Sequence, residues 1–206
     1  MCQEIELSLT IDYYFAPHSP WTYLGHERFA EIARAAGATI KVQPIDLGGV
    51  FPVSGGLPLA KRAPQRQAYR LVELARFSKH LGRPLNPQPK HFPVSADDAA
   101  KLIIATDLHD GTDAAMALAG AVLRAVWAED RNIDDARELA ALLAEQGLAA
   151  RRLDDAQSQA VHERYEAETR RAIAAGVFGA PTYVIDGELF WGQDRLDFVE
   201  RRLAAG

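Results

Sequence analysis

Sulfur is scarce in this chain, and its scarcity excludes several kinds of site. Among the 206 residues there is one cysteine, Cys2. One cysteine can form no internal disulfide, no CxxC redox pair and no cysteine-ligated zinc cluster. The six histidines form neither an HExxH motif nor a pair at metal-ligand spacing. The sequence therefore predicts no metal site and no dithiol chemistry of its own.

The chain also lacks a surplus of basic residues and any long apolar run. It has 23 lysines and arginines against 28 aspartates and glutamates, a net charge of −5. The chain has no excess of positive charge to neutralise a phosphate backbone, so we expect no nucleic-acid partner. No run approaches the length of about 18 apolar residues that suggests a membrane span. Residues 1–6 carry two glutamates and no basic residue, unlike a signal peptide. These absences favour a cytoplasmic protein.

The first part of the sequence predicts a strand, a helix and a second strand. Residues 5–15 alternate apolar and polar side chains, which is typical of a strand. Ser19-Pro20 then marks a helix start, because serine caps a helix and proline suits its first turn. We expect this helix to end at Ala36, before Gly37. A second strand over residues 39–47 completes a βαβ unit.

The middle of the chain is predicted to be helical, and strands return near its end. A loop rich in glycine and proline at residues 48–58 precedes expected helices near 64–81, 96–107, 113–129, 134–146 and 154–175. Residues 182–185 and 188–191 are predicted to form a hairpin around Asp186-Gly187, followed by a helix over 196–204.

This order of elements predicts an α/β, thioredoxin-like fold with an inserted all-helical subdomain. The order is βαβ, a block of helices, then ββα. We expect residues 1–60 and 176–206 to form the thioredoxin-like domain. Residues 61–175 would form the helical insertion, including the helix that leads back to that domain.

The turn at Ser19 is the first candidate site. A hydroxyl at a helix N-terminus lies among unpaired backbone N–H groups and at the positive end of the helix dipole. One interpretation of Ser19 is that it is a helix cap and no more. However, Ser19-Pro20-Trp21-Thr22 occupies the turn where a thioredoxin fold carries CxxC, with Ser19 and Thr22 in the two cysteine positions. This turn could therefore stabilise a thiolate that another molecule supplies.

Two segments near the C-terminus are further candidates. Pro181 precedes a short strand, and in a thioredoxin-like fold the proline that faces the active-site turn is cis, which exposes the preceding backbone to a bound peptide. Plain edge-strand geometry is the alternative for this proline. Trp191-Gly192-Gln193-Asp194-Arg195 joins the last strand to the last helix. This segment is either a helix cap or a clamp for the ammonium and carboxylate groups of an amino acid.

The sequence resembles a known enzyme family across nearly its whole length. The resemblance is carried by Asp12-Tyr13-Tyr14-Phe15, by Ser19-Pro20-Trp21-Thr22-Tyr23-Leu24, and by residues 176–182 and 187–195. Together these motifs resemble the 2-hydroxychromene-2-carboxylate isomerases. Those enzymes are close relatives of the kappa-class glutathione transferases within the DsbA-like thioredoxin superfamily.

The resemblance implies a glutathione-dependent cis-trans isomerase of an aromatic, conjugated 2-oxo acid. Such an enzyme would act in the breakdown of aromatic compounds and assemble as a homodimer. Ser19 is the implied catalytic residue, because it would hydrogen-bond the glutathione sulfur. The rest of the glutathione molecule would lie against Ala180, Pro181, Trp191, Gly192, Gln193 and Asp194. Three further residues fall near positions that contact the organic substrate: Lys61, Arg62 and Phe92.

Two other functions remain open at this point. A kappa-like transferase or peroxidase would use the same thiolate but would consume it. A redox-inert binding protein would receive an extended peptide at Pro181 without catalysis. The chain departs from the family at Gly56, where relatives often carry asparagine, and at Phe51, near which they can carry lysine. Both departures fall in the part of the site that takes the organic substrate.

Overall fold

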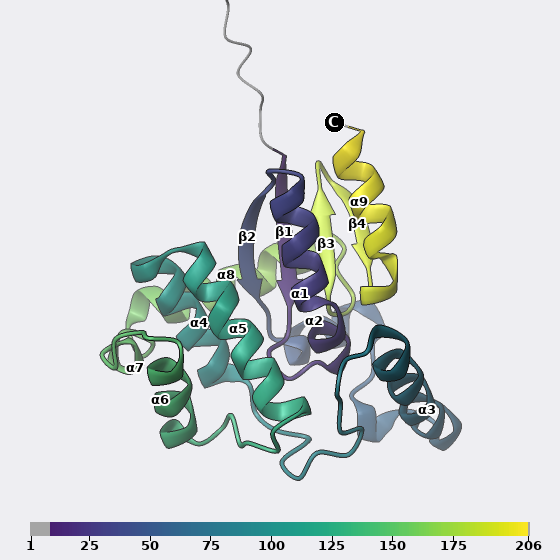
Figure 1. Ribbon diagram of the computed structural model, residues 1–206, viewed down its shortest axis with the longest axis horizontal. Coiled ribbons are helices and arrows are strands. Elements are labelled where there is room, and N and C mark those ends of the chain that lie inside the picture. Colours follow the sequence, from purple (N-terminus) through teal and green to yellow (C-terminus); the bar gives the residue numbers. More distant parts are fainter. Residues whose placement is uncertain (1–8, 206) are drawn as a thin grey trace, which may run out of the picture.

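The computed structural model describes residues 9–205 and has a four-stranded sheet at its centre (Figure 1). The strands are β1 (Thr10–Phe15), β2 (Thr39–Pro44), β3 (Thr182–Ile185) and β4 (Glu188–Trp191). They lie in the order β2-β1-β3-β4, with β1 parallel to β2 and the other two pairs antiparallel. This mixed sheet confirms the predicted thioredoxin-like α/β fold. Cys2 and the predicted strand residues 5–8 lie outside the described residues.

Helices cover both faces of this sheet (Figure 1). One face carries α1 (Pro20–Ala35) and α9 (Leu196–Ala204), which contact each other. The other face carries α2 (Leu47–Ser54) and α8 (Gln159–Ala174), which also contact each other. A 3-10 turn, η2 (Gln193–Arg195), joins β4 to α9.

Alternation along β1 supplies both layers with core residues, because successive strand side chains point to opposite faces. Tyr13 is fully buried with Phe29 of α1 and stacks on Tyr183 of β3, with ring centroids 5.5 Å apart. Its neighbour Tyr14 belongs instead to the smaller cluster that includes Val50 of α2 and Ala172 of α8. The sheet is therefore buried on both faces.

The chain between β2 and β3 supplies the remaining helices. These are α3 (Pro64–Leu81), α4 (Asp97–Asp110), α5 (Thr112–Trp127), α6 (Ala136–Glu145) and α7 (Arg152–Asp155), preceded by the 3-10 turn η1 (Leu59–Lys61). α4 and α5 pack against β2, and α5 also packs against α1. α3 lies apart from α4–α7 (Figure 1) and contacts α1, and within the described chain its buried residue is Leu74. No helix within residues 9–205 combines the length and apolarity needed to cross a bilayer.

Three predicted boundaries were wrong. The predicted loop at 48–58 contains α2, because the Asp46 carboxylate accepts hydrogen bonds from Gly48 N and Gly49 N and so caps a helix there. The second strand ends at Pro44 rather than at residue 47, where α2 already begins. The helix expected over 154–175 is divided into α7 and α8, and Ser158 caps the second of them.

Candidate functional site

The Ser19 turn has the geometry that the sequence predicted. Ser19 has an extended backbone at the N-cap of α1, and its Oγ accepts a hydrogen bond from Thr22 N at 3.2 Å. The side chain is 6% exposed. Its hydroxyl therefore lies among the first N–H groups of α1, where the partial positive charge of the helix favours an anion.

The C-terminal segments meet the Ser19 turn in space. Ser19 Oγ donates to Ala180 O at 3.5 Å, across 161 positions of sequence. The Ala180–Pro181 peptide bond is cis, as the sequence predicted. Gly192 N in turn donates to Pro181 O at 2.9 Å. Hydrogen bonds thus join three motifs that are far apart in the chain.

Beside these motifs lies a cavity of about 520 Å³, which we call the arginine cavity; Ala180 belongs to its lining, whereas Ser19 and Pro181 do not. Ala180 and the segment from Trp191 to Arg195 line one side of it. Trp21 of α1 and Phe77 of α3, whose rings meet edge to face with centroids 5.9 Å apart, also line it. The opposite wall carries Arg62, Arg66 and Arg70. The cavity therefore adjoins every predicted glutathione-binding segment.

The three arginines of that wall have no carboxylate partner among residues 9–205. The two acids in the lining are paired elsewhere: Glu73 with Arg76 at 2.9 Å and Asp194 with Arg195 at 2.5 Å. Burial, reinforced by the charge of Arg62, lowers the pKa of Arg70 to about 10. Arg70 is still charged at neutral pH. The wall therefore attracts anionic ligands.

The segment after β4, which lines the same cavity, contains buried polar groups without partners among residues 9–205. The side-chain oxygen and nitrogen of Gln193 are both buried and have no hydrogen-bond partner in the described chain. Trp191 is half exposed and lies against Gly179. A Cβ at position 179 would lie 2.6 Å from the indole Nε1 of Trp191. Gly192 has φ = 104°, a conformation that favours glycine and turns the chain into η2. Buried amide groups that lack partners are suited to a polar ligand.

The predicted substrate residues are only partly brought together. Arg62 lines the arginine cavity, and its Nε donates to Leu57 O at 2.8 Å. Phe92 lies against the Ser19 turn, with its ring centroid 6.4 Å from that of His18. Lys61 is exposed in η1 and is not part of the cavity lining.

The two departures from the family pattern are coupled in space. Gly56 lies so close to the Phe51 ring that a Cβ at position 56 would overlap Phe51 Cδ1. A larger side chain at position 56 would have to displace that ring. Phe51 and Gly56 therefore form one altered unit beside η1, rather than two independent changes.

The sequence did not point to three residues of this region. Arg66 and Arg70 follow Arg62 at four-residue intervals, the spacing that places side chains on one helix face, and that spacing was the available signal. His18 directly precedes Ser19. Its Nδ1 is buried without a partner in the described chain, and burial lowers the pKa of its imidazole. A neutral imidazole therefore adjoins Ser19.

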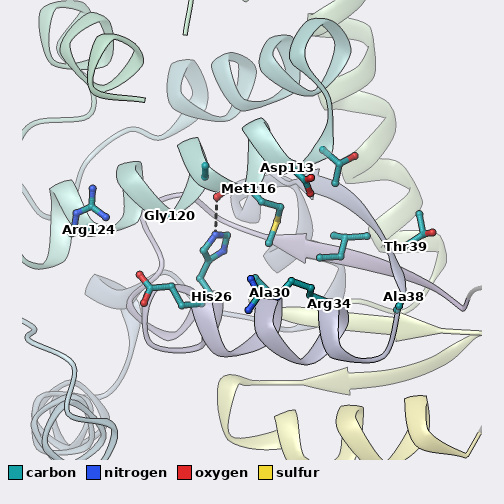
Figure 2. Close-up of a pocket in the computed structure, with 14 residues that line it drawn as sticks. His26, Ala30, Arg34, Ala38, Thr39, Asp113, Met116, Gly120 and Arg124 are labelled. Carbon is teal, nitrogen blue, oxygen red and sulfur yellow. Dashed lines mark hydrogen bonds between the residues drawn. The ribbon is translucent and has the colours of Figure 1, made fainter. Parts of the chain in front are cut away.

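A larger groove lies elsewhere, between α1 and α5, with a volume of about 780 Å³ (Figure 2). We call it the α1–α5 groove. His26 lies at its base, 4% exposed, with Nε2 2.9 Å from Met116 O and Nδ1 3.0 Å from the Tyr13 hydroxyl. Because a carbonyl can only accept, Nε2 carries the proton and Nδ1 accepts from Tyr13. Both ring nitrogens of His26 are thus already satisfied.

Comparisons with known proteins agree with these motifs. Residues 10–204 match the family model of the DSBA-like thioredoxin domain. The chain is 31% identical over 199 residues to the 2-hydroxychromene-2-carboxylate isomerase of Sphingobium xenophagum, covering 96% of this chain and 99% of that protein. It is 36% identical to glutathione S-transferase kappa 1 of Caenorhabditis elegans over 80 residues, 38% of this chain and 35% of that protein.

A solved structure extends the similarity to three dimensions. The structure of selenomethionine-labelled 2-hydroxychromene-2-carboxylate isomerase matches with a TM-score of 0.79 and 29% identity. The match covers 95% of each chain. The resemblance drawn from the Ser19, Pro181 and Trp191 segments is therefore confirmed over the whole fold, including the inserted helices.

Proposed function

We propose that this chain isomerises an aromatic, conjugated 2-oxo acid with glutathione as its cofactor. The premise is its family: the chain belongs to the DSBA-like thioredoxin family and, within it, to the 2-hydroxychromene-2-carboxylate isomerases. Its full-length relatives are named as isomerases, and the chain is an enzyme of that class. The proposal concerns the cofactor and the substrate.

The observation that carries the proposal is the meeting of Ser19 and Ala180 at the edge of a cavity with an uncompensated basic wall. Glutathione carries a thiol, an ammonium group and two carboxylates. The unpaired guanidinium group of Arg66 suits its carboxylates, and the exposed Asp194 carboxylate, beside Arg195, suits its ammonium group. The buried amide of Gln193 has hydrogen-bonding capacity to spare. The residues present therefore fit this tripeptide.

Ser19 has a specific task in this proposal. Its hydroxyl donates a hydrogen bond to the sulfur, and the N-terminus of α1 adds a favourable dipole, so that the pKa of the bound thiol falls. When bound, glutathione supplies a nucleophile that adds reversibly to a conjugated carbon, which allows the former double bond to rotate. Arg62 and Phe92 hold the organic substrate beside the Ser19 turn, and Lys61 lies outside the cavity lining.

The test is the isomerisation of 2-hydroxychromene-2-carboxylate, followed by absorbance with and without glutathione. Free thiol is counted before and after the reaction. We expect conversion that requires glutathione and leaves the thiol count unchanged. Conversion at the same rate without glutathione, or no glutathione binding by calorimetry, would overturn the proposal.

The thiol count also separates the two alternatives. The similarity to a kappa-class transferase makes thiol transfer the second candidate function. Loss of one thiol for each substrate molecule would identify a transferase or peroxidase. Binding of extended peptides without any turnover would instead identify a redox-inert binding protein.

A further inference from the structure

Arg70 of α3 is held in place by two aromatic rings rather than by an acid. Its Cζ lies 5.2 Å from the centroid of Phe92 and 5.5 Å from that of Trp127. The two rings are themselves 4.8 Å apart and inclined by 51°. Trp127 is fully buried, so its position is fixed by the core. Contacts of this kind orient a guanidinium while leaving its edge free to donate hydrogen bonds.

No group among residues 9–205 uses that free edge. Within this described range Arg70 forms no ion pair and no hydrogen bond, whereas its helix neighbours Glu73 and Arg76 pair with each other. Arg62 and Arg66 line the same wall and add positive charge instead of compensating it. Burial already lowers the pKa of Arg70. A partly buried cation without an anionic partner is costly unless a ligand provides one.

Arg70 lies near the Ser19 turn as well as in the cavity wall. Arg70 lines the arginine cavity together with Ala180, whose carbonyl accepts from Ser19. The Phe92 ring beneath Arg70 lies against His18, the residue before Ser19. The other two arginines differ: Arg66 is exposed, and Arg62 Nε is bound to Leu57 O. Of the three, Arg70 alone is fixed on an aromatic surface that reaches the Ser19 turn.

We infer that Arg70 is the specificity-determining residue of the organic substrate site and that it binds the carboxylate of an aromatic 2-oxo acid through the edge of its guanidinium. The aromatic part of the acid lies toward Phe92 and the Ser19 turn. This inference rests on the proposed function and deepens it, because it explains why the substrate would be an acid. A guanidinium binds a carboxylate through two parallel hydrogen bonds, which a neutral ketone cannot accept.

The test measures binding by calorimetry without glutathione, so that no addition to the ligand can occur. The two probes are benzylidenepyruvate and benzylideneacetone, which share the ring and the conjugated ketone but differ in a carboxylate. We expect Arg70→Gln to weaken binding of the acid by about tenfold to 100-fold and that of the ketone by less than about twofold. Arg70→Lys keeps the charge without the planar fork and should weaken acid binding by about tenfold.

Lys79→Gln is the matched control, since Lys79 is exposed on the same helix outside the cavity lining. It should leave both affinities unchanged. If Arg70→Gln does not fold, as judged by circular dichroism, the Arg70→Lys comparison decides. Equal affinity of wild type and Arg70 variant for the acid, or failure of the wild type to bind it, would overturn the inference.

The two proposals fail in different ways. Arg70-dependent binding of the acid without glutathione-dependent turnover would overturn the proposed function and leave this inference standing. Glutathione-dependent turnover of the acid with an unchanged KM in Arg70→Gln would overturn this inference and leave the proposed function standing. The glutathione affinity of Arg70→Gln, measured separately, shows whether the cofactor site is intact.

Discussion

The α1–α5 groove and the arginine cavity differ in how far the protein satisfies its own polar groups. The groove is the larger, about 780 Å³ against about 520 Å³. Its lining acids and arginines are equal in number, Glu27 and Asp113 against Arg34 and Arg124. Glu27 is paired with Arg83, and His26 uses both ring nitrogens. Arg124 is paired with Glu129, and the remaining two charges, Arg34 and Asp113, are exposed and opposite in sign, so the groove carries no unbalanced charge.

The arginine cavity is the opposite case. It collects unpaired guanidinium groups, the unpartnered Gln193 amide and a half-exposed indole at Trp191. The half-buried Arg70 and the buried Gln193 amide are costs to the folded protein alone, and a suitable ligand would remove them. The comparison favours the arginine cavity as the candidate ligand site, on the ground of its unpaired polar groups rather than its volume. Matched mutations in the α1–α5 groove and in the arginine cavity can test this conclusion.

The largest effect is expected from the titration of His26 in the groove. Burial lowers the pKa of His26 to about 4, from an ordinary 6.5, and outweighs the hydrogen bond to Met116 O and the charge of Glu27, which raise it. As the pH falls, His26 is therefore protonated at a higher pH in the unfolded chain than in the folded chain. The free energy of unfolding should decrease by about 3 kcal/mol between pH 6.5 and pH 4 through this group, then level off. Urea unfolding at a series of pH values measures it.

His26→Gln is the control for this titration. Glutamine cannot take up the proton, so the difference in stability between wild type and variant should shrink steadily as the pH falls from 6.5 to 4. His18, whose pKa is also lowered, is present in both proteins and cancels in the difference. Parallel stability curves would show that His26 titrates freely and that the groove is not satisfied as described.

The next largest effect is expected from charge reversal in the arginine cavity. Arg66→Glu replaces an unpaired cation with an anion that faces the carboxylates of glutathione. We expect about a 30-fold loss of glutathione affinity by calorimetry. Arg34→Glu makes the same change in the α1–α5 groove and should alter the affinity less than about twofold. Equal losses in the two variants would indicate a general effect of net charge.

The sequence predicted the local parts of this site better than their assembly. The hairpin at Asp186-Gly187 and the Ser19 cap follow from short-range rules of turns and caps, and both are present. The helix α2 was missed because its cap, Asp46, precedes a stretch of glycines and proline that suggests a loop. Arg70 could not be assigned because its partners, Phe92 and Trp127, come from distant parts of the chain.

A smaller effect separates the two interpretations of Ser19. Ser19→Ala and Ser158→Ala each remove a helix N-cap, from α1 and from α8. Each should lower the free energy of unfolding by about 1 kcal/mol. Only Ser19→Ala should raise the pKa of the bound glutathione thiol, by about one unit, because the sulfur loses a hydrogen-bond donor. Thiolate absorbance against pH at saturating glutathione measures that pKa. A wild-type curve identical to that of free glutathione would leave Ser19 a cap.

The smallest effect is expected at Lys61, and it decides how far the resemblance alone can place substrate residues. Lys61 and Arg62 are neighbours of equal charge, but only Arg62 belongs to the cavity lining. Arg62→Gln should raise the KM for the acid substrate about threefold to tenfold, since a charged partner is lost from a half-open wall. Lys61→Gln should change KM less than about twofold, because an exposed lysine is screened by water and salt. Steady-state kinetics at two salt concentrations tests both. A rise in KM for Lys61→Gln that matches Arg62→Gln and persists at high salt would mean that Lys61 reaches the substrate, and that the cavity walls close around it on binding.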